Sequence, residues 1–239
     1  MKKAELDILL PIYHEEENIE RVLTGIRTYV KTPHRVLAIF YNKLDPTIPA
    51  VKKIMTHDKT IIPLISTGPG LGKQLRTGFK KGEAPIYTIM MSDLSDDPRD
   101  IDKMVKKIHN GMDIVSGSRY SRKGKRIGGS KLKALLSFWG CRTLVWFTGI
   151  PTYDTTNAFK TFRASLLDTI KLESKSGYDL TMELTVKAYY KGYKISEIPT
   201  IWKERDKGYS KFKLFRYVPQ YLRWYNLAIQ KRISTVFSS

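Results

Sequence analysis

Through its first half, the chain alternates short apolar segments with segments of helical pattern, and this alternation limits the possible folds. Four segments have the length and composition of buried strands: 6–12, 36–41, 60–65 and 86–91. Helices are expected between them, at 15–29, at about 50–55, and from the glycine-rich turn 68–72 to residue 79. Because strands that alternate with helices form parallel sheets, we expect an α/β fold with a Rossmann-like, mostly parallel sheet flanked by helices.

Three aspartates follow the strand predicted at 86–91, at the end where open α/β sheets hold their ligands. Asp93, Asp96 and Asp97 repel one another, and a bound divalent cation would relieve that repulsion. Oxygen ligands favour Mg²⁺ or Mn²⁺, usually shared with substrate phosphates. Asp97 is better explained as the N-cap of a helix that begins at Pro98. Capping does not explain Asp93, so we predict a metal and phosphate site there.

Basic residues are concentrated in two parts of a chain whose net charge is +19. Residues 114–153 contain eight Lys or Arg and no acid, and residues 207–239 contain seven and no acid. This segregation indicates a polyanionic partner, which could be nucleic acid, an anionic membrane surface or a phosphorylated substrate. We expect no nucleic-acid partner, because no zinc-finger, RRM or helix-turn-helix signature is recognisable and the acids at 93–97 would repel phosphates.

Two segments have the pattern of helices that lie in a membrane interface. Residues 131–149 mix aromatic and leucine side chains with Lys and Arg, although an ordinary core helix with a basic rim would have the same pattern. From residue 215, apolar residues recur three and four apart, and Pro219 is expected to bend that helix. No stretch reaches the roughly 20 apolar residues of a spanning helix. We therefore expect peripheral binding at a membrane surface.

The cellular side of that membrane follows from the single cysteine and from the first residues. One cysteine, Cys141, excludes an internal disulfide and fits a reducing compartment. The first apolar run is interrupted by Glu5 and Asp7, which indicates a first strand and not a signal peptide. These features predict the cytoplasmic face.

The glycine-rich turn at 68–72 has two interpretations. It lacks the Gly-Lys-Ser/Thr ending of a P-loop, since Gln74 follows Lys73, so a tight turn is one interpretation. In the other, Arg76, one turn into the following helix, reaches a phosphate. Beyond this region we expect strands at 113–118 and 195–202 and a helix at 178–190.

Five short motifs occur in order along the chain. They are Leu-Pro-Ile-Tyr-His-Glu-Glu-Glu-Asn-Ile at 10–19, Met-Ser-Asp-Leu-Ser-Asp-Asp-Pro at 91–98, Gly-Ser-Arg-Tyr at 117–120, Asp-Thr-Thr-Asn-Ala-Phe-Lys at 154–160 and Arg-x-x-Gly-x-Ser-Lys at 205–211. This series resembles family 2 glycosyltransferases, in the branch of dolichol-phosphate mannose synthase and related polyprenyl-phosphate hexosyltransferases. The resemblance covers residues 6 to about 215.

The resemblance implies a GT-A catalytic domain at 1–211, followed by a basic amphipathic helical tail at 212–239. It implies transfer of a hexose, with inversion, from a nucleotide sugar to a polyprenyl or dolichyl phosphate. The donor would be GDP-mannose or a UDP-hexose. Because relatives often carry membrane helices after this domain, a membrane-embedded partner protein is a further candidate.

The same resemblance assigns roles to individual residues. The nucleotide pocket would be lined by Pro11, Tyr13 and Glu15, with Asn42 or Asp45 at the contact position after the second strand. Asp93 would hold the metal against the donor diphosphate. The first acid of the metal motif is replaced by Met91, so Ser95 or Asp96 would complete the site. Phosphates would be bound by Arg119, Arg126 and Lys131, and the site would be closed by Arg205, Ser210 and Lys211.

The acceptor determines whether a general base is needed. A metal ion and Arg or Lys donors would stabilise the charge on the departing diphosphate. A phosphate acceptor is already anionic, whereas a hydroxyl acceptor needs a base. Asp154 and Glu183 are the catalytic candidates, although either could instead orient an arginine or backbone groups. A glycan or protein hydroxyl acceptor, or a non-catalytic protein that only binds nucleotide sugar, are the alternatives.

Overall fold

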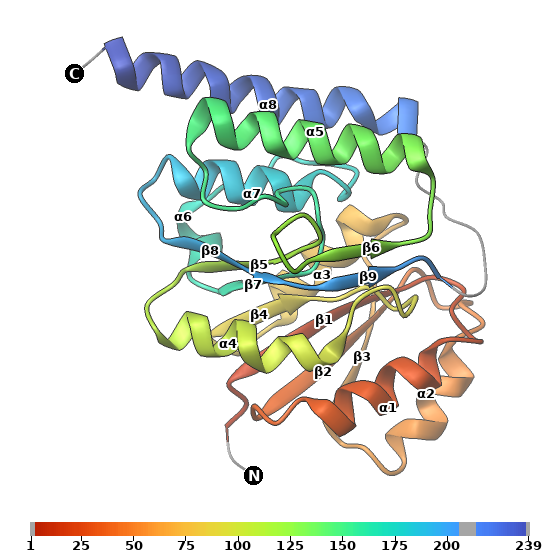
Figure 1. Cartoon of the computed structure of the whole chain (residues 1–239). Coiled ribbons are helices and arrows are strands. Elements are labelled where there is room, and N and C mark those ends of the chain that lie inside the picture. The colour runs from red at the N-terminus through yellow and green to blue at the C-terminus, as the bar shows by residue number, and fades with distance from the viewer. Residues whose placement is uncertain (1–2, 206–213, 238–239) are drawn as a thin grey trace.

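The computed structural model describes residues 3–205 and 214–237 and has a seven-stranded sheet at its centre (Figure 1). The strand order is β3-β2-β1-β4-β7-β5-β8. The strands are β1 (Leu6–Ile12), β2 (His34–Phe40), β3 (Ile61–Ile65), β4 (Ile86–Ile89), β5 (Ile114–Ser118), β7 (Lys160–Arg163) and β8 (Ile195–Pro199). Every neighbouring pair is parallel except the two that include β7, so the predicted mostly parallel α/β sheet is confirmed.

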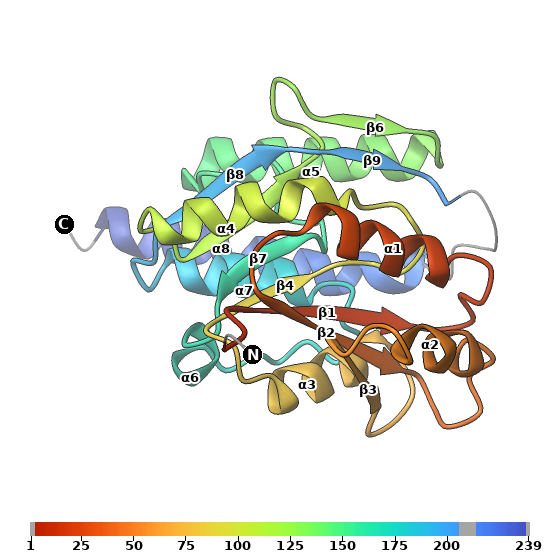
Figure 2. The same ribbon diagram turned by 90° about the horizontal axis from the view of Figure 1, so that it is seen from below.

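Helices cover both faces of this sheet (Figures 1 and 2). They are α1 (Ile19–Tyr29), α2 (Ile48–Met55), α3 (Leu71–Lys81), the 3₁₀ turn η1 (Pro98–Asp100), α4 (Ile101–His109), α5 (Lys131–Thr148), α6 (Leu166–Thr169), α7 (Leu180–Tyr189) and α8 (Leu214–Phe237). Helices α1, α2 and α4 pack on one face around Ile8 and Leu10, and α3, α6 and α7 pack on the other around Leu9 and Ile89. Successive residues of a strand point to opposite faces, which explains why β1 is buried throughout.

Strand β7 is the largest difference from the sequence prediction. It lies between β4 and β5 and runs antiparallel to both. Its sequence, Lys-Thr-Phe-Arg, has no apolar run, yet Lys160 and Thr161 are fully buried. Thr161 pairs through its hydroxyl with Thr88 of β4 at 2.7 Å. Because the strand depends on partners distant in sequence, its local pattern could not predict it.

The strand predicted at 195–202 is wrong in its length, because Thr200 divides it. The Thr200 backbone N–H donates to Ser118 O, and its hydroxyl donates to Asp100 Oδ2 at 2.8 Å. Residues beyond Thr200 form β9 (Ile201–Lys203), which leaves the main sheet and pairs with β6 (Lys125–Ile127). This small sheet places the chain after β5 beside the chain after β8, so both approach the carboxyl edge of the main sheet.

Helices α5 and α8 lie side by side on the outside of α7, where Figure 1 draws them in green and blue. Leu144 of α5, Val186 of α7 and Trp224 of α8 form a buried cluster. Trp224 also donates to Asp179 Oδ2 at 2.7 Å, and α8 is a single helix that contains Pro219. Among the described residues, no helix combines the length and apolarity needed to cross a bilayer.

Candidate active site

A cavity of about 930 Å³ lies at the carboxyl edge of the sheet and continues between α5 and α8. The order of the strands in the sheet determines which residues form the wall of the cavity. Pro11 lies near the end of β1 and Tyr13 follows that strand, Asp93 and Asp96 follow β4, and Arg119 follows β5. The far part is apolar and is lined by residues such as Leu136 and Trp139 of α5 and Leu222 of α8. One continuous cavity therefore joins an acidic and basic region to an apolar one.

Asp93 and Arg205 form the central ion pair of this cavity. Arg205 Nη2 lies 2.6 Å from Asp93 Oδ2, while its Nη1 lies 3.4 Å from Glu15 Oε1. The other Asp93 oxygen accepts from the Ser95 backbone N–H at 3.1 Å. Asp93 and Arg205 are separated by more than a hundred residues, so the fold brings together two of the predicted motifs.

Two buried carboxyl groups beside this pair have raised pKa values. Burial is the main cause for Asp96, assisted by the Asp93 charge, and raises its pKa to about 7 even though Asp96 Oδ2 accepts from Met91 N. Burial likewise raises the pKa of Glu15 to about 7, against the opposing effect of Asn18 and Arg205. Carboxyl groups whose pKa values are raised by burial in a cavity are typical of functional sites.

The backbone beside both acidic segments is strained. His14, with φ of 55°, and Leu94, with φ of 64°, are the non-glycine residues with positive φ in the described chain. Such a conformation costs on the order of 1–3 kcal/mol and persists only where other contacts hold it. Asp45 supplies one such contact, since its Oδ2 accepts from the His14 N–H at 3.3 Å. Glu15 directly follows His14 and Asp93 directly precedes Leu94, and both carboxylates line the cavity.

The carboxylates of Asp93 and Asp96 could supply part of the coordination shell of a metal ion, but not all of it. Within the described chain, no three His, Cys, Asp or Glu side chains come together as a metal cluster. Asp93 and Asp96 nevertheless line the same cavity, together with Ser95. Because Mg²⁺ is usually held by one or two carboxylates together with substrate phosphates and water, these residues suit a cation that arrives with a diphosphate. They do not form a complete cage of protein ligands.

Arg119 is positioned by a fully buried acid. Its Nε and Nη2 lie 2.7 and 2.8 Å from the two oxygens of Asp154, and its backbone N–H donates to the same carboxylate. Burial raises the pKa of Asp154, but Arg119 and Lys160 outweigh that effect and hold it below the ordinary range. Asp154 does not line the cavity, so the geometry gives it a positioning role and argues against the predicted role as a base.

Lys160 completes this network from β7. It is fully buried and its Nζ donates to Asp154 O at 3.1 Å. Burial lowers the pKa of Lys160 to about 8, although Asp154 opposes that shift. Lys160 was not among the predicted site residues, because a lysine inside a strand has no local signal of burial.

This buried ammonium predicts a pH dependence of stability. A base whose pKa is lower in the folded chain than in the unfolded chain adds stability as pH rises from its folded toward its unfolded pKa. Relative to Lys160→Met, the wild type should gain about 2 kcal/mol in free energy of unfolding between about pH 8 and about pH 9.5. Urea unfolding at each pH measures the difference, with the exposed Lys171→Met as control. Parallel pH profiles of wild type and Lys160→Met would contradict it.

Other predicted residues lie outside the cavity. Glu183 is buried in α7, where it accepts from the backbone of Glu173 and Ser174 and pairs with Lys187. Its geometry therefore argues against catalysis and for fixing the loop before α7. Arg76 Nη2 donates to Leu172 O and Ser174 O, which takes it away from any phosphate in the cavity.

Of the remaining predicted site residues, one lines the cavity and others do not. Arg126 lines the cavity, with its guanidinium 4.5 Å from the centroid of the Trp202 ring. Lys131 is exposed at the start of α5 and does not line it, and Asn42 caps the backbone of its own loop. Ser210 and Lys211 lie outside the described residues.

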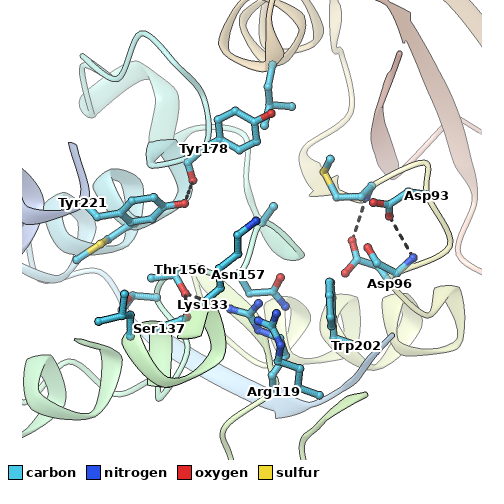
Figure 3. Close-up of a pocket in the computed structure, with 18 of the residues that line it drawn as sticks. Asp93, Asp96, Arg119, Lys133, Ser137, Thr156, Asn157, Tyr178, Trp202 and Tyr221 are labelled. Carbon is cyan, nitrogen blue, oxygen red and sulfur yellow. Dashed lines mark hydrogen bonds between the residues drawn. The ribbon is translucent and has the colours of Figure 1, made fainter. Parts of the chain in front are cut away.

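Several cavity residues were missed, and they come from α5 and from the segment after Asp154. Figure 3 shows Lys133 extending into the cavity beside Arg119, with Ser137 near Thr156. Ser137 Oγ lies 2.8 Å from Thr156 Oγ1, which also accepts from Arg119 Nη2 at 3.1 Å. The spacing of Lys133, Ser137 and Gly140 on one helical face was the signal that could have found them.

The fold is of the GT-A type, a Rossmann-like, mostly parallel sheet with a cavity at its carboxyl edge. A model of the family described as Glycosyl transferase family 2 matches residues 7–170, and the chain therefore belongs to that family. Glucosyl-3-phosphoglycerate synthase from Mycobacterium tuberculosis, in complex with phosphoglyceric acid, has a similar structure. The TM-score is 0.67 at 16% identity, over 95% of this chain and 80% of that one. At that identity the likeness concerns the fold alone.

Two curated relatives add information at low identity. The dolichol-phosphate mannosyltransferase of Pyrococcus furiosus is 24% identical over 92% of this chain. This chain spans only 64% of that protein's length. The polyprenol monophosphomannose synthase of Mycolicibacterium smegmatis is 23% identical, over 85% of this chain and 79% of its own.

Proposed function

We propose that this protein transfers a hexose, with inversion, from a nucleotide sugar to a polyprenyl or dolichyl phosphate at the cytoplasmic face of a membrane. One observation carries the proposal: the cavity joins charged groups at the sheet edge to an apolar trough between α5 and α8. A sugar nucleotide needs the first region and a prenyl chain needs the second. The names of the curated relatives support the same acceptor class.

The donor is proposed to lie along the carboxyl ends of β2, β1 and β4. Pro11 and Tyr13 would contact the nucleoside, and Asp93 would face the diphosphate. A bound Mg²⁺ or Mn²⁺, held by Asp93 and Asp96, would neutralise charge on the departing diphosphate. Solved structures of the mycobacterial synthase contain Mn²⁺ and UDP, which supports this arrangement. Arg205 would turn from Asp93 to the diphosphate, since a guanidinium binds phosphate oxygens well.

The acceptor phosphate is proposed to bind on the opposite wall. Arg119, Lys133 and Ser137 converge there (Figure 3), and Arg126, which packs on Trp202, lines the same cavity. A phosphate oxygen would attack the anomeric carbon from the side opposite the diphosphate. The bond from that carbon to the diphosphate oxygen breaks, and its electron pair leaves with the nucleoside diphosphate. Because the phosphate is already anionic, no general base is required.

The outer faces of α5 and α8 are proposed to bind an anionic membrane. Trp146 and Phe147 are 64% and 61% exposed, and Leu222 and Ile233 are half exposed on α8. The same two helices carry Arg142, which is partly exposed and packs on the rings of Phe138 and Tyr153, and the exposed Arg232. Exposed aromatic and basic side chains on paired helices suit the interface between headgroups and acyl chains. A membrane-embedded partner protein on this face remains a further proposal.

Loss of two aromatic side chains is expected to weaken membrane binding. Trp146→Ser combined with Phe147→Ser should reduce partition onto vesicles of phosphatidylcholine and phosphatidylserine by at least about 10-fold. Vesicle sedimentation measures this, and Leu44→Ser removes an exposed apolar residue from a different loop as the control. Equal sedimentation of the double variant and the wild type would contradict the proposed membrane face.

A transfer assay tests the function. The full chain would be incubated in detergent with polyprenyl phosphate, radiolabelled GDP-mannose, UDP-glucose or related donors, and either Mn²⁺ or EDTA. We expect lipid-linked product with one donor, lost when EDTA replaces Mn²⁺. Nucleotide-sugar binding with no lipid product from any donor would overturn the acceptor. It would leave a glycan or protein hydroxyl acceptor, or a protein that only binds nucleotide sugars.

A further inference from the structure

Gln74 presents a fixed hydrogen-bond acceptor to the cavity. It is buried in the first turn of α3, with only 3% of its surface exposed, and it lines the cavity. Its Nε2 donates to Ile12 O and Ile39 O, both at 2.7 Å, and these carbonyls stand at the ends of β1 and β2. Both amide hydrogens are thus used, which sets the orientation of the amide. Across residues 3–205 and 214–237, its Oε1 accepts no hydrogen bond.

The surroundings of Gln74 suit a planar heterocycle. Pro11, Tyr13 and Tyr41 line the same end of the cavity, and the two tyrosine rings pack edge to face with centroids 4.5 Å apart. Aromatic and proline surfaces pack well against flat rings. Strand β1 lies between β2 and β4 in the sheet, so this end adjoins the Asp93 region. A diphosphate at Asp93 would therefore extend its nucleoside toward Gln74.

The two residues after β2 that the resemblance assigned to nucleotide contact have other partners. Asn42 Oδ1 accepts from the Leu44 N–H at 2.8 Å. The two oxygens of Asp45 accept from the backbone of His14 and Thr47. Neither Asn42 nor Asp45 lines the cavity. The acceptor presented to the nucleoside end thus comes from α3 and not from the segment after β2.

We propose that Gln74 Oε1 selects the nucleobase by accepting a hydrogen bond from a protonated ring nitrogen, an inference that rests on the proposed donor site. Uracil at N3 and guanine at N1 carry that hydrogen. Cytosine at N3 and adenine at N1 present a lone pair, and two acceptors that face each other repel. Rejection by an unpaired buried acceptor is an effective source of specificity. The site therefore takes uridine or guanosine diphosphates and discriminates against cytidine and adenosine diphosphates.

Calorimetric titration of the full chain tests this with UDP, GDP, CDP and ADP in the presence of Mn²⁺. We expect UDP or GDP to bind at least about 10-fold more tightly than CDP and ADP. Gln74→Met should remove that preference, because it deletes the hydrogen bond to UDP or GDP and also the repulsion of CDP and ADP. Lys73→Met, an exposed neighbour on α3, is the control that should keep the preference. Methylation of the favoured base, at uracil N3 or guanine N1, should weaken binding to the wild type by a similar factor.

Each other outcome overturns the inference in a recognisable way. If Gln74→Met weakens all four nucleotides equally, Gln74 has only a structural role. If the variant keeps the preference, another group recognises the base. The methylated nucleotides need no variant, so they decide the matter even if Gln74→Met does not fold, and unchanged binding of the methylated base would refute the proposal. If the wild type binds none of the diphosphates, the proposed function itself fails, and this inference with it.

Discussion

Asp93→Asn is expected to lower the rate of sugar transfer by about 10²–10³-fold or more, with little loss of stability. The substitution preserves the shape of the side chain and an oxygen that accepts from the Ser95 N–H at 3.1 Å. It removes the negative charge that pairs with Arg205 and that would hold a divalent cation. The effect should therefore appear in kcat, because charge develops on the diphosphate only as the bond to the sugar breaks.

Asp168→Asn is the matched control for this experiment, since Asp168 is exposed on α6 and does not line the cavity. Both variants would be assayed for lipid-linked product and for thermal unfolding. If Asp93→Asn retains a rate within about threefold of the wild type while EDTA still abolishes transfer, Asp93 is not the metal ligand. The role would then have to pass to Asp96 and Ser95.

Asp154→Ala is expected to lower the free energy of unfolding by about 3–5 kcal/mol and to abolish transfer. Removal of the fully buried carboxylate leaves Arg119 and Lys160 as buried cations without their shared partner. Breaking one side of a buried ion pair is costly because the remaining charge cannot recover its hydration. Urea unfolding of the variant, with Asp168→Ala as the exposed control, measures the expected loss.

The double variant Arg119→Met with Asp154→Leu separates stability from function. Replacing both charges by apolar side chains of similar size should recover part of the lost stability, because Arg119 no longer stands unpaired, whereas Lys160 still lacks the Asp154 charge. Transfer should not recover, because the proposed phosphate contact of Arg119 is absent. Recovery of activity in a stable double variant would refute the assignment of Arg119. If Asp154→Ala leaves the free energy of unfolding unchanged, the proposed contribution of the buried Arg119–Asp154 ion pair to stability is refuted.

Local patterns predicted the elements that depend on local contacts. The strands at 6–12, 36–41 and 60–65 and the helices between them have boundaries close to those observed, because each has an apolar pattern of its own period. Asp93 was found for a related reason, because it follows a strand of a parallel sheet, and such positions lie together at one edge of the sheet. Pro11 and Tyr13 were assigned by the resemblance to family 2 glycosyltransferases, and both line the cavity.

Side chains that reach the cavity from helices could not be placed in this way. Lys131 and Lys133 are equally basic in sequence, yet only Lys133 lines the cavity, because the packing of α5 on α7 and α8 sets which face turns inward. Arg76 and Gln74 lie two residues apart on α3, and only Gln74, which was assigned no role, lines the cavity. The Arg76 guanidinium donates a hydrogen bond to a carbonyl of the loop before α7, whereas the Gln74 amide donates to carbonyls of β1 and β2, which fix its orientation.

The amino-acid sequence alone predicted the α/β class, the mostly parallel sheet and the acidic site after β4. These follow from the periodicity of apolar residues and from the position of polar residues at strand ends. The roles of Asp154, Glu183 and Lys160 needed the folded chain. All three are buried charges, and the partner of a buried charge is set by long-range packing. Chemistry at strand ends is therefore encoded locally, whereas the networks that orient it arise from contacts between distant segments.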